Sequence, residues 1–129
     1  MLTGETKIRV RYAETDRMGL LHHANYLVYF EQARTDLLRD RGTTYKDLED
    51  EGFYLVIAKI DIKYRSPAYY DDELTVRTTV TKTSPIRIEH KYEVFRPDGT
   101  LICEGSSTLA CVDSAGKIQQ MPEWLSNVK

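Results

Sequence analysis

One long helical pattern, followed by four strand patterns, is the feature that most constrains the fold of this chain. The helical pattern runs from Tyr26 to Arg41, where apolar side chains recur every three or four residues before Gly42 offers a left-handed stop. Four later segments alternate apolar and polar residues as strands do, and they are joined by short connections. These segments are Phe53 to Arg65, Leu74 to Lys82, Ile86 to Phe95 and Leu101 to Val112.

Shorter elements flank these five. Residues Lys7 to Tyr12 alternate cations with Ile8, Val10 and Tyr12, which predicts a first strand with those three side chains on its apolar face. A short second helix is expected from Tyr45 to Glu51, because Thr44 and Asp47 have the spacing of a capping box.

The order of elements predicts an α+β domain. One curved antiparallel sheet of about five strands would wrap one long central helix. The 129 residues fill a single domain, residues 1–129, and leave no room for a second. A single helix cannot cover both faces and the edges of such a sheet, so we predict a homo-oligomer, either a dimer or a tetramer.

Charge and hydropathy argue against two classes of partner. The 18 basic and 20 acidic residues are interspersed, so no basic field predicts nucleic-acid binding. The longest apolar stretches, such as Phe53 to Ala58, are far shorter than the roughly 18 residues that suggest a membrane span. No basic and apolar leader opens the chain, and we expect a cytoplasmic protein.

The two cysteines do not predict a disulfide or a metal site. Cys103 and Cys111 lie in one predicted strand, where they would be roughly 26 Å apart, beyond the ~7 Å limit for a bridge. No cysteine or histidine lies at ligand spacing from them, so no zinc site is expected. Both are expected to be reduced and buried as small apolar side chains.

The loop between the first strand and the long helix concentrates the reactive side chains. Asp16 precedes the helix by enough residues to fold back over its start, where unpaired N–H groups can donate to a developing oxyanion. Gly19 would let the loop turn. A base or nucleophile beside such donors suits acyl transfer. A lone Asp16 could also simply cap the loop, so the residues themselves leave both roles open.

Short motifs on both sides of this loop form a pattern that extends over nearly the whole chain. They are Arg9-Val10, Thr15-Asp16, Gly19, His23-Ala24-Asn25-Tyr26, Tyr29 to Thr35, Lys63 to Ala68, Tyr70 to Leu74 and the turn Pro97-Asp98-Gly99. In this combination the sequence resembles the hotdog-fold acyl-CoA thioesterases of the 4-hydroxybenzoyl-CoA thioesterase and YbgC-like group. One departure is Leu20, where the family usually has a β-branched residue.

The resemblance implies hydrolysis of an acyl-CoA thioester to a free acid and CoA within a hotdog fold. Asp16 would be catalytic, either as nucleophile on the thioester carbonyl or as general base toward water. The backbone N–H near His23 would polarise the carbonyl, and the His23 side chain would orient Asp16 or the substrate. Glu31 on the helix is an alternative carboxylate, although pairing with Arg34 or Thr35 is the expected role.

The resemblance also implies a set of substrate-binding residues. Gly19 and Tyr26 would shape the acyl site, and Lys59 and Arg65 would meet the CoA phosphates, since the chain has no glycine-rich phosphate loop. Coenzyme A is part of the substrate, so neither a cofactor nor a metal is expected. His90 lacks any motif around it and is expected to be a core or surface histidine.

Two other functions remain open from the sequence. A hotdog acyl-CoA hydratase or dehydratase would need an acid and a base across a carbon–carbon double bond, and Asp16 with His23 could serve. A non-catalytic acyl-CoA binding protein could have retained the fold. The joint presence of Asp16, Gly19 and His23 argues against the latter.

Overall fold

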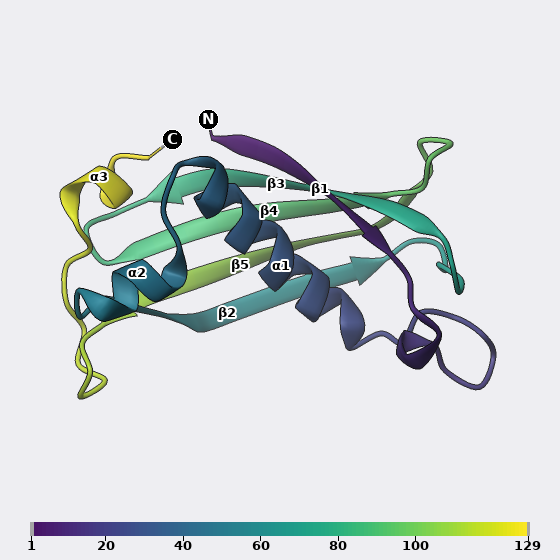
Figure 1. Cartoon of the computed structure of the whole chain (residues 1–129), viewed down its shortest axis with the longest axis horizontal. Coiled ribbons are helices and arrows are strands. Elements are labelled where there is room, and N and C mark those ends of the chain that lie inside the picture. The colour runs from purple at the N-terminus through teal and green to yellow at the C-terminus, as the bar shows by residue number, and fades with distance from the viewer. Residues whose placement is uncertain (1, 129) are drawn as a thin grey trace.

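A five-stranded antiparallel sheet curves around one long helix in this computed structural model, which describes residues 2–128 (Figure 1). The order of strands across the sheet is β1-β3-β4-β5-β2. The strands are β1 (Thr3–Arg9), β2 (Tyr54–Tyr64), β3 (Glu73–Thr83), β4 (Arg87–Phe95) and β5 (Leu101–Val112). The predicted α+β hotdog architecture, with a central helix on about five strands, is confirmed.

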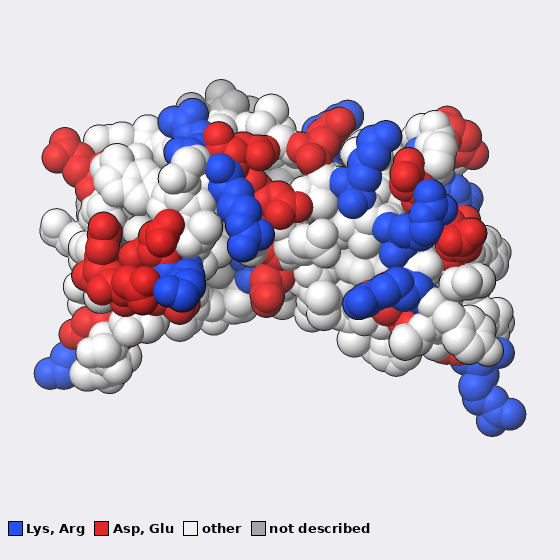
Figure 2. Space-filling view, viewed as in Figure 1, with Lys and Arg blue, Asp and Glu red and all other residues white. Residues whose placement is uncertain are grey.

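The start of the long helix and the two short helices lie at opposite ends of the sheet. Helix α1 (Asn25–Asp40) crosses in front of the sheet, while α2 (Tyr45–Asp50) and α3 (Glu123–Ser126) lie at the far end from the start of α1 (Figure 1). Thr44 caps α2, accepting a hydrogen bond from the Asp47 N–H at 3.0 Å, as the capping spacing predicted. On the face seen in Figure 2, Lys and Arg side chains are interspersed with Asp and Glu, and acidic side chains gather over α2.

Burial of one face of α1 against the sheet forms the core. The ring of Phe30 stacks on that of Tyr92 in β4, with centroids 4.3 Å apart. Gly105 of β5 permits this approach, because a Cβ there would lie 2.7 Å from the Phe30 ring and 2.7 Å from a backbone oxygen. Both cysteines are free and buried in β5, as expected.

The position of the first strand differs from the prediction. The strand covers Thr3–Arg9 and not Lys7 to Tyr12, and Tyr12 begins a 3₁₀ turn with 78% of its surface exposed. After Arg9 the backbone of Val10 pairs with the turn before β3, donating to the Asp72 oxygen at 2.9 Å. The predicted apolar face therefore extends only as far as Val10, because the chain turns before it reaches Tyr12.

The apolar alternation of β2 does not correspond to one buried face. A bulge between Ile57 and Lys59 shifts the register against β5, which interrupts the alternation predicted for the Phe53 to Arg65 segment. In this chain β2 is an edge strand, and Val56 is 45% exposed. Val56, Ile57 and Ala58 are therefore exposed along the edge, whereas Leu55 is partly buried against the core.

Candidate active site

The loop between β1 and α1 holds the Asp16 carboxylate by its own backbone. Asp16 Oδ1 accepts hydrogen bonds from the N–H of Met18 at 2.9 Å and of Leu20 at 3.2 Å. The Gly19 N–H returns to the Asp16 carbonyl at 3.0 Å, and Gly19 has a φ of 79°, which favours glycine. No hydrogen bond to Asp16 Oδ2 occurs within residues 2–128, so this oxygen is available to a substrate or water.

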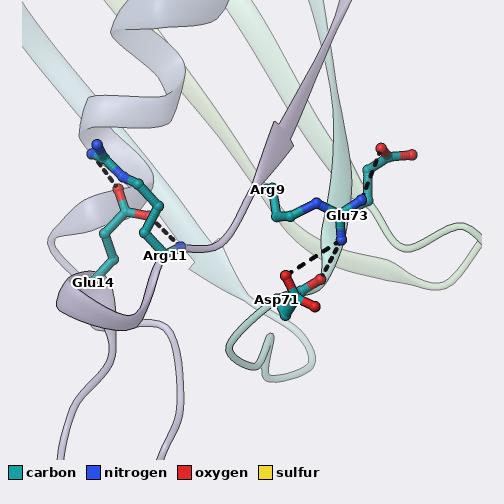
Figure 3. Close-up of polar contacts among 5 residues, drawn as sticks. All are labelled: Arg9, Arg11, Glu14, Asp71 and Glu73. Carbon is teal, nitrogen blue, oxygen red and sulfur yellow. Dashed lines mark hydrogen bonds and ion pairs between the residues drawn. The ribbon is translucent and has the colours of Figure 1, made fainter.

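Buried Glu14 anchors the start of this loop. Its carboxylate accepts hydrogen bonds from the Arg11 N–H at 2.8 Å, the Arg11 guanidinium at 3.1 Å and the Tyr29 hydroxyl at 2.7 Å. Figure 3 shows Arg11 folded over Glu14, and the separate cluster in which Arg9 meets Asp71 and Glu73. Burial opposes the charge on Glu14, but these hydrogen bonds outweigh it and hold the pKa below its ordinary value.

Hydrogen bonds to the Glu14 backbone carbonyl connect this loop to the start of α1. The Glu14 carbonyl accepts from the His22 N–H at 2.8 Å and from the Asn25 side-chain amide at 3.1 Å. Asn25 therefore ties the helix to the loop, and the residue that caps α1 is Ala24, which has no capping side chain. The first turn of α1 is left without a side-chain cap.

The His23 backbone lies just before the start of α1. Its N–H has no hydrogen-bond partner among residues 2–128, whereas its carbonyl accepts from the Tyr64 hydroxyl at 3.0 Å. The His23 ring stacks on that of His22, with centroids 4.2 Å apart, and His22 Nδ1 accepts from the Ala24 N–H. The peptide preceding α1 is thus fixed in orientation while its donor at His23 stays free.

A pocket of about 340 Å³ brings these groups together. Four of the six predicted site residues line it: Asp16, His23, Tyr26 and Arg65. The other lining residues are Leu20, Leu21, Tyr64, Ser66 and Pro67. Gly19 lies in the adjoining turn and shapes the loop without lining the pocket, and Lys59 lies on the β2 edge outside the pocket.

The tyrosines and Arg65 define the pocket walls. Tyr26 is buried and packs edge-on against Tyr64, with ring centroids 5.4 Å apart. Burial raises the pKa of Tyr26 well above its ordinary value, so its hydroxyl is neutral. The Arg65 guanidinium donates to Glu104 at 2.7 Å and stands half-exposed at the rim.

Sequence reasoning missed the part of the pocket that comes from the end of β2. Tyr64 is half-exposed at the end of β2, and its hydroxyl contacts the residue just before α1. The only signal for it was its place in the Lys63 to Ala68 motif. Glu31 does not join this pocket. Of its two expected partners, Arg34 lines the same separate pocket but makes no ion pair with it within residues 2–128, whereas the Thr35 hydroxyl donates to the Glu31 backbone carbonyl at 2.8 Å.

Neither a metal-ligand cluster nor a membrane-spanning helix is found in the described part of the chain. Within residues 2–128, no three His, Cys, Asp or Glu side chains gather as metal ligands would. None of the helices in that range is long and apolar enough to cross a membrane. Burial raises the pKa of the nearby Cys103 thiol to about 12, so this cysteine is a protonated core residue.

Comparison with known proteins gives consistent matches over almost the full chain. The Thioesterase-like superfamily matches residues 10–128. YneP of Bacillus subtilis is 37% identical over 113 residues, covering 88% of this chain and 82% of that protein. The acyl-CoA thioester hydrolase YbgC of Escherichia coli O6:H1 is 31% identical over 106 residues, covering 82% of this chain and 79% of YbgC. The structure of a DHNA-CoA thioesterase from Staphylococcus aureus has a TM-score of 0.92 and 35% identity, and the match covers 97% of this chain and 87% of that one.

Proposed function

The chain belongs to the Thioesterase-like superfamily, and from this premise we propose that it hydrolyses the thioester bond of an acyl-CoA, with Asp16 as the reacting carboxylate. Membership confirms the predicted enzyme class, a thioester hydrolase. The acyl-CoA substrate is proposed because the E. coli and S. aureus relatives are named for CoA thioesters.

The observation that carries the catalytic assignment is the shared pocket of Asp16 and His23. Two backbone N–H groups fix Asp16 Oδ1, so the carboxylate cannot rotate freely and Oδ2 remains to react. The unpaired His23 N–H is a preformed donor for the oxygen that gains charge during attack. These are the nucleophile or base and the oxyanion donor that acyl transfer requires.

The proposed reaction can follow either of two routes from this geometry. In the first, Asp16 Oδ2 attacks the thioester carbon, CoA leaves as the thiolate, and water then hydrolyses the acyl-aspartyl anhydride. In the second, Asp16 takes a proton from a water molecule as that water attacks the carbon directly. In both routes the carbonyl oxygen becomes an oxyanion beside the His23 N–H.

The walls of the pocket suggest how the substrate lies. Tyr26, Leu20 and Tyr64 offer aromatic and aliphatic surface for an acyl group. Arg65 at the rim is the cation nearest to a CoA phosphate entering this pocket, and Lys59 would add a second cation farther along β2.

The β2 edge supports the predicted homo-oligomer. Val56 and Ile57 are both about half-exposed on an edge strand that pairs only with β5, and exposed apolar edges are usually paired or covered in native proteins. We assign this edge to a second copy of the chain. Multi-angle light scattering should give at least twice the 14.9 kDa monomer mass, and Ile57→Lys should shift the protein toward monomer.

One assay separates the three candidate functions. Hydrolysis releases a free thiol from saturated short-chain, long-chain and aromatic acyl-CoAs; the aromatic substrate is included because of the S. aureus relative. A hydratase would convert crotonyl-CoA without releasing thiol, and a binding protein would retain acyl-CoA unchanged. Thiol release from at least one acyl-CoA of this panel is the expected result, and its absence from all of them would contradict the proposal.

Isotope labelling of Asp16 can detect the covalent route. In a single turnover in H₂¹⁸O, direct water attack labels the released acid. Attack of water on the carbonyl carbon of the acyl group in an anhydride also labels the acid, but attack on the aspartyl carbon labels Asp16 instead. Label in the Asp16 peptide, read by mass spectrometry, would therefore establish the covalent route.

A further inference from the structure

A buried arginine lies in the middle of α1, away from the catalytic pocket. Arg34 is only 9% exposed, yet across residues 2–128 no carboxylate lies within 4.0 Å of its guanidinium. By contrast, Arg39, farther along the same helix, pairs with Asp36 at 3.9 Å. A buried cation without a counter-ion is costly, so its environment needs a further explanation.

The hydrogen-bond partners of Arg34 are neutral. Its Nη1 donates one long hydrogen bond, 3.5 Å, to the Tyr92 hydroxyl, which also shares a 2.6 Å hydrogen bond with Ser107. His90 is 3% exposed and its Nδ1 has no partner among the described residues; burial, with a smaller effect from Arg34, lowers its pKa to about 3. Neither tyrosine nor neutral histidine offsets the charge of Arg34. No guanidinium nitrogen is fully buried without a partner, because the group also meets the Tyr45 hydroxyl and the open pocket.

Arg34 opens onto a pocket of about 420 Å³ between α1, α2 and the sheet. Leu55, Leu109 and Tyr45 give it an apolar wall. The rim cations Arg39 and Lys46 are paired with Asp36 and Asp50, which lie outside the lining. The rim carboxylates Glu31 and Glu49 make no ion pair within residues 2–128. Among the cations that line this pocket, Arg34 is therefore the one without a carboxylate partner in the described part of the chain.

This pocket is distinct from the catalytic one. The two linings share no residue. Arg34 lies nine residues beyond Asn25, so it is about 14 Å further along the helix axis from the end where Asp16 and His23 lie.

We propose that the Arg34 pocket binds the carboxylate of a small aliphatic organic acid. A guanidinium presents parallel donors that match the two oxygens of a carboxylate. The hydrocarbon chain of the acid would lie against Leu55 and Leu109. This proposal does not depend on the catalytic role of Asp16, because it concerns a different pocket and a different charge.

Calorimetric titration of the full chain tests the ligand class. The probes are hexanoate, its neutral isostere hexanamide, and inorganic phosphate. Wild type should bind hexanoate saturably, and hexanamide and phosphate at least 10-fold more weakly. Arg34→Gln should weaken hexanoate binding roughly 10- to 100-fold, as expected for loss of charge-assisted hydrogen bonds. Arg87→Gln, which changes an exposed arginine of β4 outside the pocket, is the matched control and should leave binding unchanged.

A measurement on wild type keeps the proposal testable if Arg34→Gln fails to fold. The NMR signal of the Arg34 Nε–H, assigned with the milder Arg34→Lys variant, should shift saturably with hexanoate and not with hexanamide. Tighter binding of phosphate, equal binding by Arg34→Gln, or an Arg34 signal unmoved by hexanoate would each overturn the proposal.

Discussion

Replacing Glu14 by glutamine should measurably loosen the loop that holds Asp16. Glu14 is 7% exposed, and its Oε1 accepts from both the Arg11 N–H and the Tyr29 hydroxyl. A glutamine side chain at this position can retain both bonds, but as neutral ones, and each then loses about 1 kcal/mol. The Arg11 guanidinium is 77% exposed, so loss of its pairing adds little.

The expected cost of Glu14→Gln is therefore about 2 kcal/mol, or a fall in Tm of about 7 °C for a chain of this length. Differential scanning calorimetry at pH 7 measures this. Glu5→Gln, which alters an exposed carboxylate bonded to Arg77, is the control and should shift Tm by less than about 2 °C. Equal shifts in the two variants would refute the reasoning.

The pH dependence gives a second readout of the same change. The Glu14 pKa is lowered in the folded protein, so the stability it supplies is complete above its ordinary value of 4.5. That contribution is lost as the pH falls through the lowered pKa. The Tm difference between wild type and Glu14→Gln should therefore narrow below pH 4.5, and a constant difference would contradict the assigned cause.

Three further changes test other parts of the structure. His90 has a pKa lowered to about 3 by burial, so folding should lose stability as pH falls from 6.5 toward 3, and His90→Asn should flatten that part of a Tm-against-pH curve. Gly105→Ala should destabilise by about 1 to 3 kcal/mol in urea unfolding, because its Cβ would clash with Phe30 and with backbone; no loss would contradict the packing. Tyr64→Phe removes the hydrogen bond to the His23 carbonyl and should lower kcat roughly 2- to 10-fold at unchanged Tm; an unchanged kcat would show that this bond does not position the oxyanion donor.

The sequence predicted the elements of the fold because their patterns are local. Apolar spacing in Tyr26 to Arg41 and alternation in the later strands depend on neighbours in the chain, so α1 and β3 to β5 lie within a few residues of their predicted bounds. The bulge after Ile57 was not predictable in this way, since it depends on how β2 pairs with β5.

For the candidate site too, the sequence indicates the residues of the local loop but not those that reach it through tertiary contacts. Asp16 and His23 lie in one short loop, where a family resemblance was enough to propose them, and both line the same pocket. Tyr64 reaches the loop only because β2 ends beside the start of α1, which is a tertiary contact. The burial of Arg34 was hidden for a similar reason, because an arginine at that helical position is usually solvated.

The rate of thioester hydrolysis by Asp16→Asn is the most direct test of the central claim. Asparagine can keep the hydrogen bonds from the Met18 and Leu20 N–H groups to Oδ1, while the second oxygen becomes an NH₂ that can neither attack nor accept a proton. We predict that kcat on the best acyl-CoA falls by at least about 100-fold while Tm stays within about 2 °C of wild type. A folded Asp16→Asn protein that releases CoA at close to the wild-type rate would contradict the account.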